Sequence, residues 1–174
     1  MTLPYVIMAF VTFQRLGELL VASSNTRYLR EHGAIEMGRS HYPAMVTLHA
    51  SWLMVLWLTV GGHAVNLPLL GIFLALQGLR IWVLATLGRR WTTRIIVLPG
   101  APLITGGPFR FLRHPNYCVV IGEIAILPLV FGLIWVAILF SLLNAAMLWV
   151  RIRCESQSLY EREASRIGTA VRPE

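Results

Sequence analysis

Polar residues, glycines and prolines are concentrated in one thirteen-residue segment, residues 105–117, between long apolar stretches. The segment reads TGGPFRFLRHPNY and contains two arginines, a histidine, an asparagine and a tyrosine. Gly106 and Gly107 allow the backbone to approach a ligand closely, whereas Pro108 and Pro115 stiffen it. We interpret it as a binding segment at a membrane face. A turn followed by an arginine-anchored helix start is the alternative that composition leaves open.

A second group of polar residues, RIRCESQSL at 151–159, follows the last apolar stretch. Arg151 and Glu155 are four residues apart, so on a helix both side chains project from one face. An ordinary ion pair on a C-terminal helix is the alternative interpretation. The arginine distribution places this helix and residues 105–117 on the same side of a membrane. We therefore expect their polar groups to converge on one cavity.

The composition is that of an integral membrane protein. Of the 174 residues, 56% are hydrophobic and only 13% are charged, and the mean hydropathy is +0.66. The net charge of +7 comes from 15 arginines against 8 glutamates, without lysine or aspartate. Arginines at the ends of apolar stretches are typical of the cytoplasmic edge of membrane proteins. The sequence has no basic cluster with interleaved aromatic residues, so we expect no nucleic-acid binding.

We predict an all-α integral membrane protein with about five transmembrane helices in one domain, residues 1–174. The predicted spans cover residues 3–22, 44–60, 68–88, 118–131 and 133–150, and a cytoplasmic C-terminal helix covers residues 151–168. Apart from Arg15 and Arg80, which lie inside spans, the arginines follow the first and third spans or belong to the C-terminal segment. The positive-inside rule therefore predicts an outside N-terminus and a cytoplasmic C-terminus. We expect the first span to be retained and the protein to lie in a bacterial inner membrane.

Several polar residues lie inside these predicted spans. Arg15 and Glu18 are three residues apart and share a helix face, so we expect snorkelling or a structural ion pair near the interface rather than the alternative, a direct role at the substrate. Glu123 has two interpretations: a structural bridge to Arg80 or Arg15, or a catalytic group that acts on the proton of a substrate. His49 is the one titratable group of its span, and we expect a hydrogen-bonded packing residue.

The remaining polar and sulfur-containing residues predict no metal or disulfide framework. The five histidines have no metal-type spacing. Cys118 and Cys154 both fall near the predicted cytoplasmic side, where thiols stay reduced. We expect Gln77 and Asn144 to form hydrogen bonds between helices.

Three elements together carry a family resemblance. These are TGGPF at 105–109, RHPNY at the start of a span at 113–117, and Arg151, Glu155 and Leu159 at the end of the last span. In this combination the chain resembles the isoprenylcysteine carboxyl methyltransferase family, and more closely its short bacterial members. The resemblance covers about the last half of the chain. The first two spans add no weight to it.

The resemblance implies an all-helical enzyme that binds S-adenosylmethionine without a Rossmann sheet and methylates an oxygen of a lipophilic acceptor. By matching positions, it implies that the cofactor is bound by Ala101, Pro102, Leu103, Ile104, Phe109, His114, Pro115, Asn116, Tyr117 and Glu155. It places Arg151 at the acceptor. The family commonly has tyrosine where this chain has Phe109, so only ring packing carries over there. Arg94 is the nearest candidate for a further upstream cofactor contact.

The sequence leaves the acceptor and two other classes of function open. Arg151 would orient a carboxylate acceptor. If the acceptor is an acidic phenol or enol, the positive charge of Arg151 would instead favour its ionised oxygen by lowering the pKa of that group. A small transporter or proton pathway would instead use the intramembrane charged residues as a relay. A noncatalytic scaffold would use the basic face to hold a partner or anionic lipid.

Overall fold

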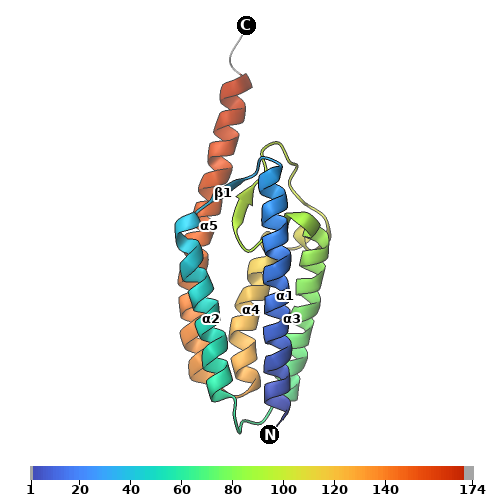
Figure 1. Ribbon diagram of the computed structural model, residues 1–174, viewed down its shortest axis with the longest axis vertical. Helices are drawn as coiled ribbons and strands as arrows, with labels where there is room; N and C mark the ends of the chain where they lie inside the picture. The colour runs from blue at the N-terminus through green and yellow to red at the C-terminus, as the bar shows by residue number, and fades with distance from the viewer. Residues whose placement is uncertain (1, 171–174) are drawn as a thin grey trace.

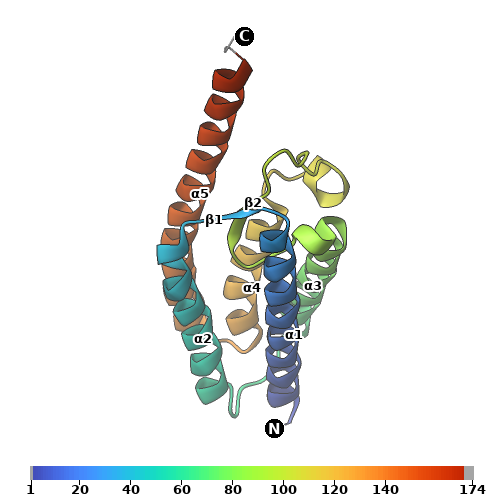
Figure 2. The same ribbon diagram turned by 45° about the horizontal axis from the view of Figure 1, so that its top comes forward.

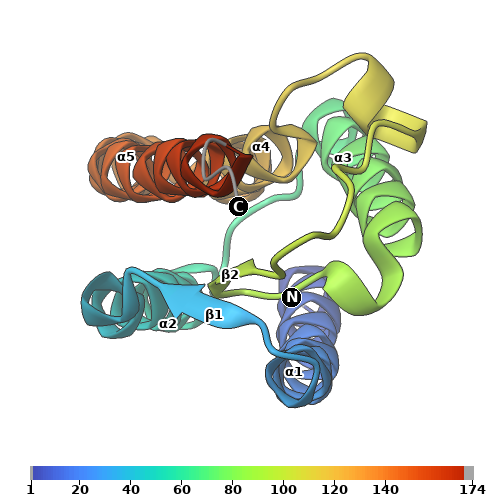
Figure 3. The same cartoon turned by 90° about the horizontal axis from the view of Figure 1, so that it is seen from above.

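The computed structural model describes residues 2–170, with side chains described up to residue 155. Five long helices run roughly along one axis, and the N- and C-termini lie at opposite ends (Figure 1). The helices are α1 (Leu3–Glu31), α2 (Tyr42–Thr59), α3 (Leu67–Leu87), α4 (Pro115–Val130) and α5 (Ile134–Ala170). Seen from above, α5, α4 and α3 lie along one side, and α2 and α1 lie along the other (Figure 3).

The composition of these helices confirms an all-α membrane protein. Three of them are long and apolar enough to cross a membrane: Leu3–Glu31, Leu67–Arg90 and Ile134–Glu155. Helix α4 is a shorter apolar helix, and α2 completes the bundle. Large apolar side chains point outward, as expected in lipid, and Phe13 and Leu58 are 74% and 77% exposed. The orientation across the membrane stays a prediction.

One end of the bundle, which we call the arginine-rich end, also carries the only strands among the described residues. Strands β1 (Ile35–Met37) and β2 (Ile95–Val97) pair antiparallel, with Glu36 opposite Ile96 (Figure 2). Short 3-10 helices lie at the same end: η1 (Arg39–His41), η2 (Gly88–Arg90) and η3 (Gly107–Arg110). The pairing of β1 with β2 joins the α1–α2 connection to the α3–α4 connection, two segments that are far apart in sequence.

Two helices extend further than the predicted spans. Helix α1 continues nine residues beyond residue 22, the predicted end of the first span. This extension is tied to the segment after α3, because Asn25 Nδ2 donates to the carbonyls of Gly88 (3.2 Å) and Trp91 (2.8 Å). Helix α5 is continuous through the boundary at residue 150, so the expected C-terminal helix continues the helix of the last span without a break. It extends beyond the bundle (Figure 1).

The main apolar core fills the half of the bundle away from the arginine-rich end. Its buried residues come from all five helices and the α4–α5 turn, and include Met8, Leu56, Phe73, Leu127 and Val136. Helices α4 and α5 are joined by a tight turn, since α4 ends at Val130 and α5 begins at Ile134. The core therefore fixes the helices at one end and leaves the polar half to form a cavity.

The small sheet is held by a carboxylate shared among arginines. The Glu36 side chain is only 3% exposed and pairs with Arg30, Arg94 and Arg39. Burial raises the pKa of the Glu36 carboxyl, but the hydrogen bonds and charges of Arg94 and Arg30 outweigh it and lower this pKa below its ordinary value of 4.5. Ionised Glu36 therefore stabilises the arginine-rich end.

Glu36→Gln should reduce stability near neutral pH, and the difference from wild type should shrink in acid. A carboxyl group with a lowered folded-state pKa stabilises above its unfolded pKa, and the contribution is lost as pH falls through the folded pKa. Thermal unfolding in detergent between pH 7 and about pH 3 tests this. Exposed Glu31 forms no ion pair among the described residues, so Glu31→Gln is the matched control. A pH-independent difference would contradict the assignment.

The turn at the start of residues 105–117 is constrained by its packing against α3. Gly107 has φ +57°, and a Cβ there would clash with the Thr86 side chain on α3. Gly107→Ala should destabilise the protein by about 1–3 kcal/mol, because it adds backbone strain and a steric clash. Gly106 has φ −83° and open space around its Cα, so Gly106→Ala is the control. Equal unfolding temperatures for the two variants would show that this turn is not constrained.

Candidate functional site

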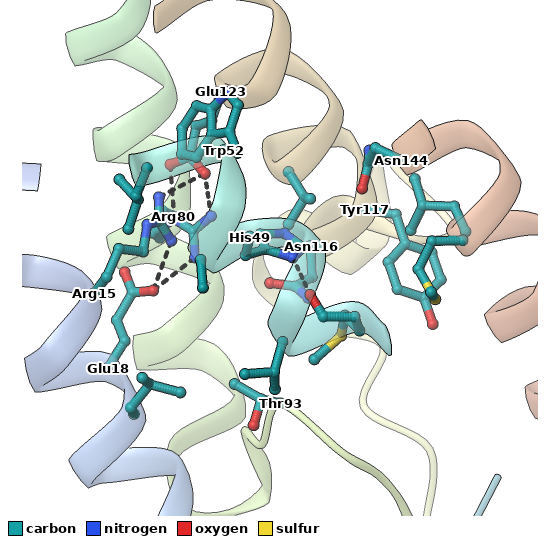
Figure 4. Close-up of a pocket in the computed structure, with 18 of the residues that line it drawn as sticks. Arg15, Glu18, His49, Trp52, Arg80, Thr93, Asn116, Tyr117, Glu123 and Asn144 are labelled. Carbon is teal, nitrogen blue, oxygen red and sulfur yellow. Dashed lines mark hydrogen bonds and ion pairs between the residues drawn. The ribbon is translucent and has the colours of Figure 1, made fainter. Parts of the chain in front are cut away.

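A central cavity of about 310 Å³ lies in the polar half of the bundle. It is lined by residues from α1, α2, α4 and α5, by Arg80 of α3, and by the segment from Trp91 to Thr93 that precedes β2. Figure 4 shows its two polar sides: Arg15, Glu18, Arg80 and Glu123 on one, and Tyr117 on the other. The first four residues form what we call the ion network.

Arg151 lies at the side of the cavity nearest the arginine-rich end. Its side chain belongs to α5, is only 7% exposed, and contacts the Met45 sulfur of α2. Its Nη1 donates to the Thr93 carbonyl at 3.1 Å. These contacts hold the guanidinium against the cavity wall, where its remaining donors can reach a bound anion or ionised oxygen.

The start of α4 and the end of the last span meet beside Arg151. The Tyr117 hydroxyl donates to Glu155 Oε2 at 2.8 Å, and the ring of Tyr117 stacks on His114 with centroids 5.3 Å apart. His114 and Glu155 are therefore linked through one side chain, at one end of the bundle. Pro115, buried at the first position of α4, and Asn116, which lines the cavity, belong to the same helix start.

The other residues of the expected cofactor set lie elsewhere. Phe109 packs against a cluster formed by Ala22, Val83 and Trp91, between α1 and α3. The segment 101–104 does not line the central cavity. Within it, Leu103 is 74% exposed, and the Pro102 carbonyl accepts a hydrogen bond from Arg90 Nη1 at 2.6 Å.

The chain turns away from the cavity after β2. Figure 3 shows the path from β2 toward α3, beside which η3 lies, before it returns to α4. The upstream candidate Arg94 pairs with Glu36 and stacks over the Tyr42 ring, with its Cζ 3.8 Å from the centroid. A cofactor that touches His114 and segment 101–104 together would thus have to span this loop.

Comparison with known proteins agrees with the motif and the membrane fold. The family model described as the isoprenylcysteine carboxyl methyltransferase (ICMT) family matches residues 69–161, more than half of the chain. This chain belongs to that family. It is also 38% identical over 162 residues to the uncharacterized protein YpbQ of Bacillus subtilis, covering 90% of this chain and 96% of YpbQ. No solved structure matches the chain.

Membership of this family makes the protein a kind of membrane methyltransferase. The matched range begins in α3 and includes the turn at 105–117, Arg151 and Glu155. It confirms the resemblance that the sequence motifs indicated. Helices α1 and α2 lie outside the matched range, although they provide half of the cavity wall.

The ion network clarifies the two interpretations of Glu123. Its Oε1 accepts from Gln77 Nε2 and Arg80 Nε, both at 2.8 Å. Its Oε2 accepts from Arg15 Nη2 at 2.8 Å and also pairs with Arg80. Each oxygen therefore has two donors, which favours the structural bridge. A direct catalytic role for Glu123 stays a prediction.

Two expected helix pairings are also present. Arg15 Nη1 donates to Glu18 Oε2 at 2.7 Å, as the three-residue spacing predicted. Arg80 Nη1 reaches the same Glu18 oxygen at 2.9 Å, so α1, α3 and α4 share one network. Gln77 donates to Glu123 and accepts from Gln14, which supports its interhelical role.

The cavity also includes His49, which the sequence predicted only as a hydrogen-bonded packing residue, and two tryptophans to which the sequence assigned no role. His49 lies between the ion network and Tyr117 (Figure 4), and its Nδ1 donates to the Met45 carbonyl at 2.9 Å. This bond leaves Nε2 as the ring nitrogen for a ligand. Trp52 and Trp91 also line the cavity, and their buried Nε1 groups have no partner within the described part of the chain. Lone residues on apolar helices give no sequence signal for such a role.

Glu123→Gln should lower the stability of the protein by about 3 kcal/mol, because it leaves two guanidinium groups poorly compensated inside the bundle. The measurement is thermal unfolding in detergent. The control is Glu31→Gln, because Glu31 is exposed and lies on α1 outside the ion network. This variant should change stability by less than about 0.5 kcal/mol. A stable Glu123→Gln protein that has lost only activity would instead support the catalytic interpretation.

Proposed function

We propose that this protein transfers a methyl group from S-adenosylmethionine to an oxygen of a lipophilic acceptor at the cytoplasmic face of a bacterial inner membrane. The observation that carries the proposal is the contact between Tyr117 and Glu155, with Arg151 beside it at the cavity. These residues come from two of the three sequence elements that carry the family resemblance. The proposal gives them distinct roles.

The side chains around Tyr117 suit the chemistry of the cofactor. S-adenosylmethionine combines a sulfonium cation with a carboxylate, an amine, a ribose and an adenine, and it supplies an electrophilic methyl group when bound. Glu155 can accept hydrogen bonds from the amine or the ribose hydroxyls. The stacked rings of His114 and Tyr117 offer a flat surface for the base or an aromatic face for the cation.

The other expected cofactor residues fall into two groups. Pro115 and Asn116 can contribute through the start of α4, because they adjoin His114 and Tyr117. Phe109 and the segment Ala101, Pro102, Leu103 and Ile104 would contribute only if a bound cofactor extends along the loop between β2 and η3. Their present packing supports a role in covering the cofactor rather than in orienting its reacting end.

The central cavity provides a route for an acceptor from the bilayer. Leu16, Leu19 and Val46 line it and are also 40–52% exposed, so the cavity wall between α1 and α2 reaches the lipid-facing surface. A hydrocarbon tail can lie against these side chains while its polar end approaches Arg151. This arrangement gives a physical reason for a methyltransferase to be embedded in the membrane.

Arg151 would act on the acceptor oxygen. A carboxylate is already ionised, so Arg151 would orient it with two hydrogen bonds, whereas for a phenol or enol its charge would favour the ionised oxygen. In both cases the largely apolar cavity would remove water from the nucleophile and help to align it with the methyl group. Arg151 and Tyr117 come from different helices, so the bundle sets their distance.

Glu155→Ala should weaken binding of S-adenosylmethionine roughly ten- to a hundredfold, as expected for loss of charge-assisted hydrogen bonds. Arg151→Ala should retain the cofactor but slow methyl transfer roughly a hundredfold or more. Calorimetry on the full chain in detergent or lipid measures the first effect, and transfer of an isotope-labelled methyl group into membrane lipid extracts measures the second. Arg153→Ala is the control, because Arg153 is exposed and stacks on Trp149.

Each role can fail separately. Equal cofactor affinity for wild type and Glu155→Ala would show that the role of Glu155 is wrong. Unchanged transfer by Arg151→Ala would remove Arg151 from the acceptor site. A folded wild-type protein that binds no S-adenosylmethionine would contradict methyl transfer and favour a transporter or a scaffold.

A further inference from the structure

A second cavity, of about 460 Å³, lies at the arginine-rich end between the last turns of α1, the start of α2 and the segment that enters β2. Its lining differs from that of the central cavity because it is rich in cations and hydroxyls. We call it the arginine cavity, after Arg27, Arg30 and Arg94 in its wall. The family motifs do not include these three residues.

The Thr26 side chain points to a missing partner in this cavity. Thr26 lines it and is 7% exposed, and its Oγ1 forms no hydrogen bond within the described residues. A buried hydroxyl without a partner is costly, and a threonine within a helix normally bonds the carbonyl one turn earlier. The Thr26 hydroxyl is thus a buried donor beside the arginine cavity that no described residue satisfies.

The charges of the arginine cavity favour an anion. Arg30 and Arg94 both pair with Glu36, whereas Arg27 is exposed and has no carboxylate within ion-pair distance in the described part of the chain. Glu31 also lines the cavity. Because Glu36 is shared by Arg30, Arg94 and Arg39, the four arginines around this cavity outnumber the carboxylates of Glu31 and Glu36, and the surplus positive charge favours an anion.

The geometry points to a binding site for a monoanionic phosphate group, as in the head group of an anionic phospholipid or in free phosphate. We propose that Arg27, Arg30 and Arg94 hold its oxygens with the Thr26 hydroxyl. Guanidinium groups bind phosphate oxygens through paired hydrogen bonds, and a hydroxyl adds a further donor. The proposal does not depend on methyl transfer.

The surroundings of the cavity favour a lipid as the source of the phosphate. Leu19 lines both cavities and is 44% exposed, and the neighbouring Leu20 is 73% exposed on the same helix. A phosphate in the arginine cavity would therefore have an apolar surface of α1 beside it for acyl chains. Because Thr93 also lines both cavities, such a lipid would lie next to the opening of the central cavity.

Native mass spectrometry of the full chain in detergent tests the site, with dioleoylphosphatidylglycerol and dioleoylphosphatidylcholine as probes. Wild type should retain the anionic lipid and lose the zwitterionic one. Thr26→Val and Arg27→Gln should each reduce retention about tenfold, the effect of losing roughly one charge-assisted hydrogen bond. Arg110→Gln removes the same charge from an exposed position at the same end, outside the cavity, and should retain the lipid.

A second measurement separates the two sources of phosphate. Inorganic phosphate is titrated while the unfolding temperature is followed, with sulfate-free buffer as the reference. A rise that Arg27→Gln abolishes would assign the site to free phosphate, whereas lipid retention without such a rise would assign it to phospholipid. Equal retention of the two lipids without a phosphate effect, or equal behaviour of Arg27→Gln and Arg110→Gln, would overturn the proposal.

Discussion

The structure depends on burying a carboxylate among guanidinium groups inside an apolar bundle. Glu123 of α4 receives hydrogen bonds from Arg15 of α1 and Arg80 of α3, and Arg80 also reaches Glu18. Removing charges from water in a membrane is expensive, so each group must keep its partners. The network therefore fixes three helices relative to one another. It also keeps one wall of the central cavity polar, where apolar side chains would otherwise close the space.

The opposite wall is set by a different constraint, the meeting of α4 and α5 at the arginine-rich end. The tight turn after Val130 makes these helices antiparallel neighbours, which brings Tyr117 at the start of α4 beside Glu155 near the end of the last span. Arg151, one turn earlier on α5, then faces the segment before β2 and donates to the Thr93 carbonyl. The small sheet, clamped by Glu36, holds that segment in place.

The two cavities divide the polar half of the bundle between different chemistries. The central cavity combines an apolar, lipid-facing side with Arg151 and Tyr117, which suits a lipophilic molecule with a polar end. The arginine cavity offers cations and hydroxyls near the predicted head-group region. Helix α1 contributes to the walls of both cavities, and its extension beyond residue 22 lines the arginine cavity.

The sequence by itself determined the class of protein, the approximate helices, the Arg15–Glu18 pair and the family, because these follow from local hydropathy, helical spacing and short motifs. Only the tertiary structure decided which distant groups meet. Glu123 could have faced either a substrate or two arginines, and packing placed both arginines against it. Phe109 adjoins the motif in sequence, yet it packs on Trp91 and Val83, since the loop after β2 turns toward α3. The sequence predicted His49 only as a hydrogen-bonded packing residue, because a lone side chain on an apolar helix lines a cavity only when other helices enclose one around it.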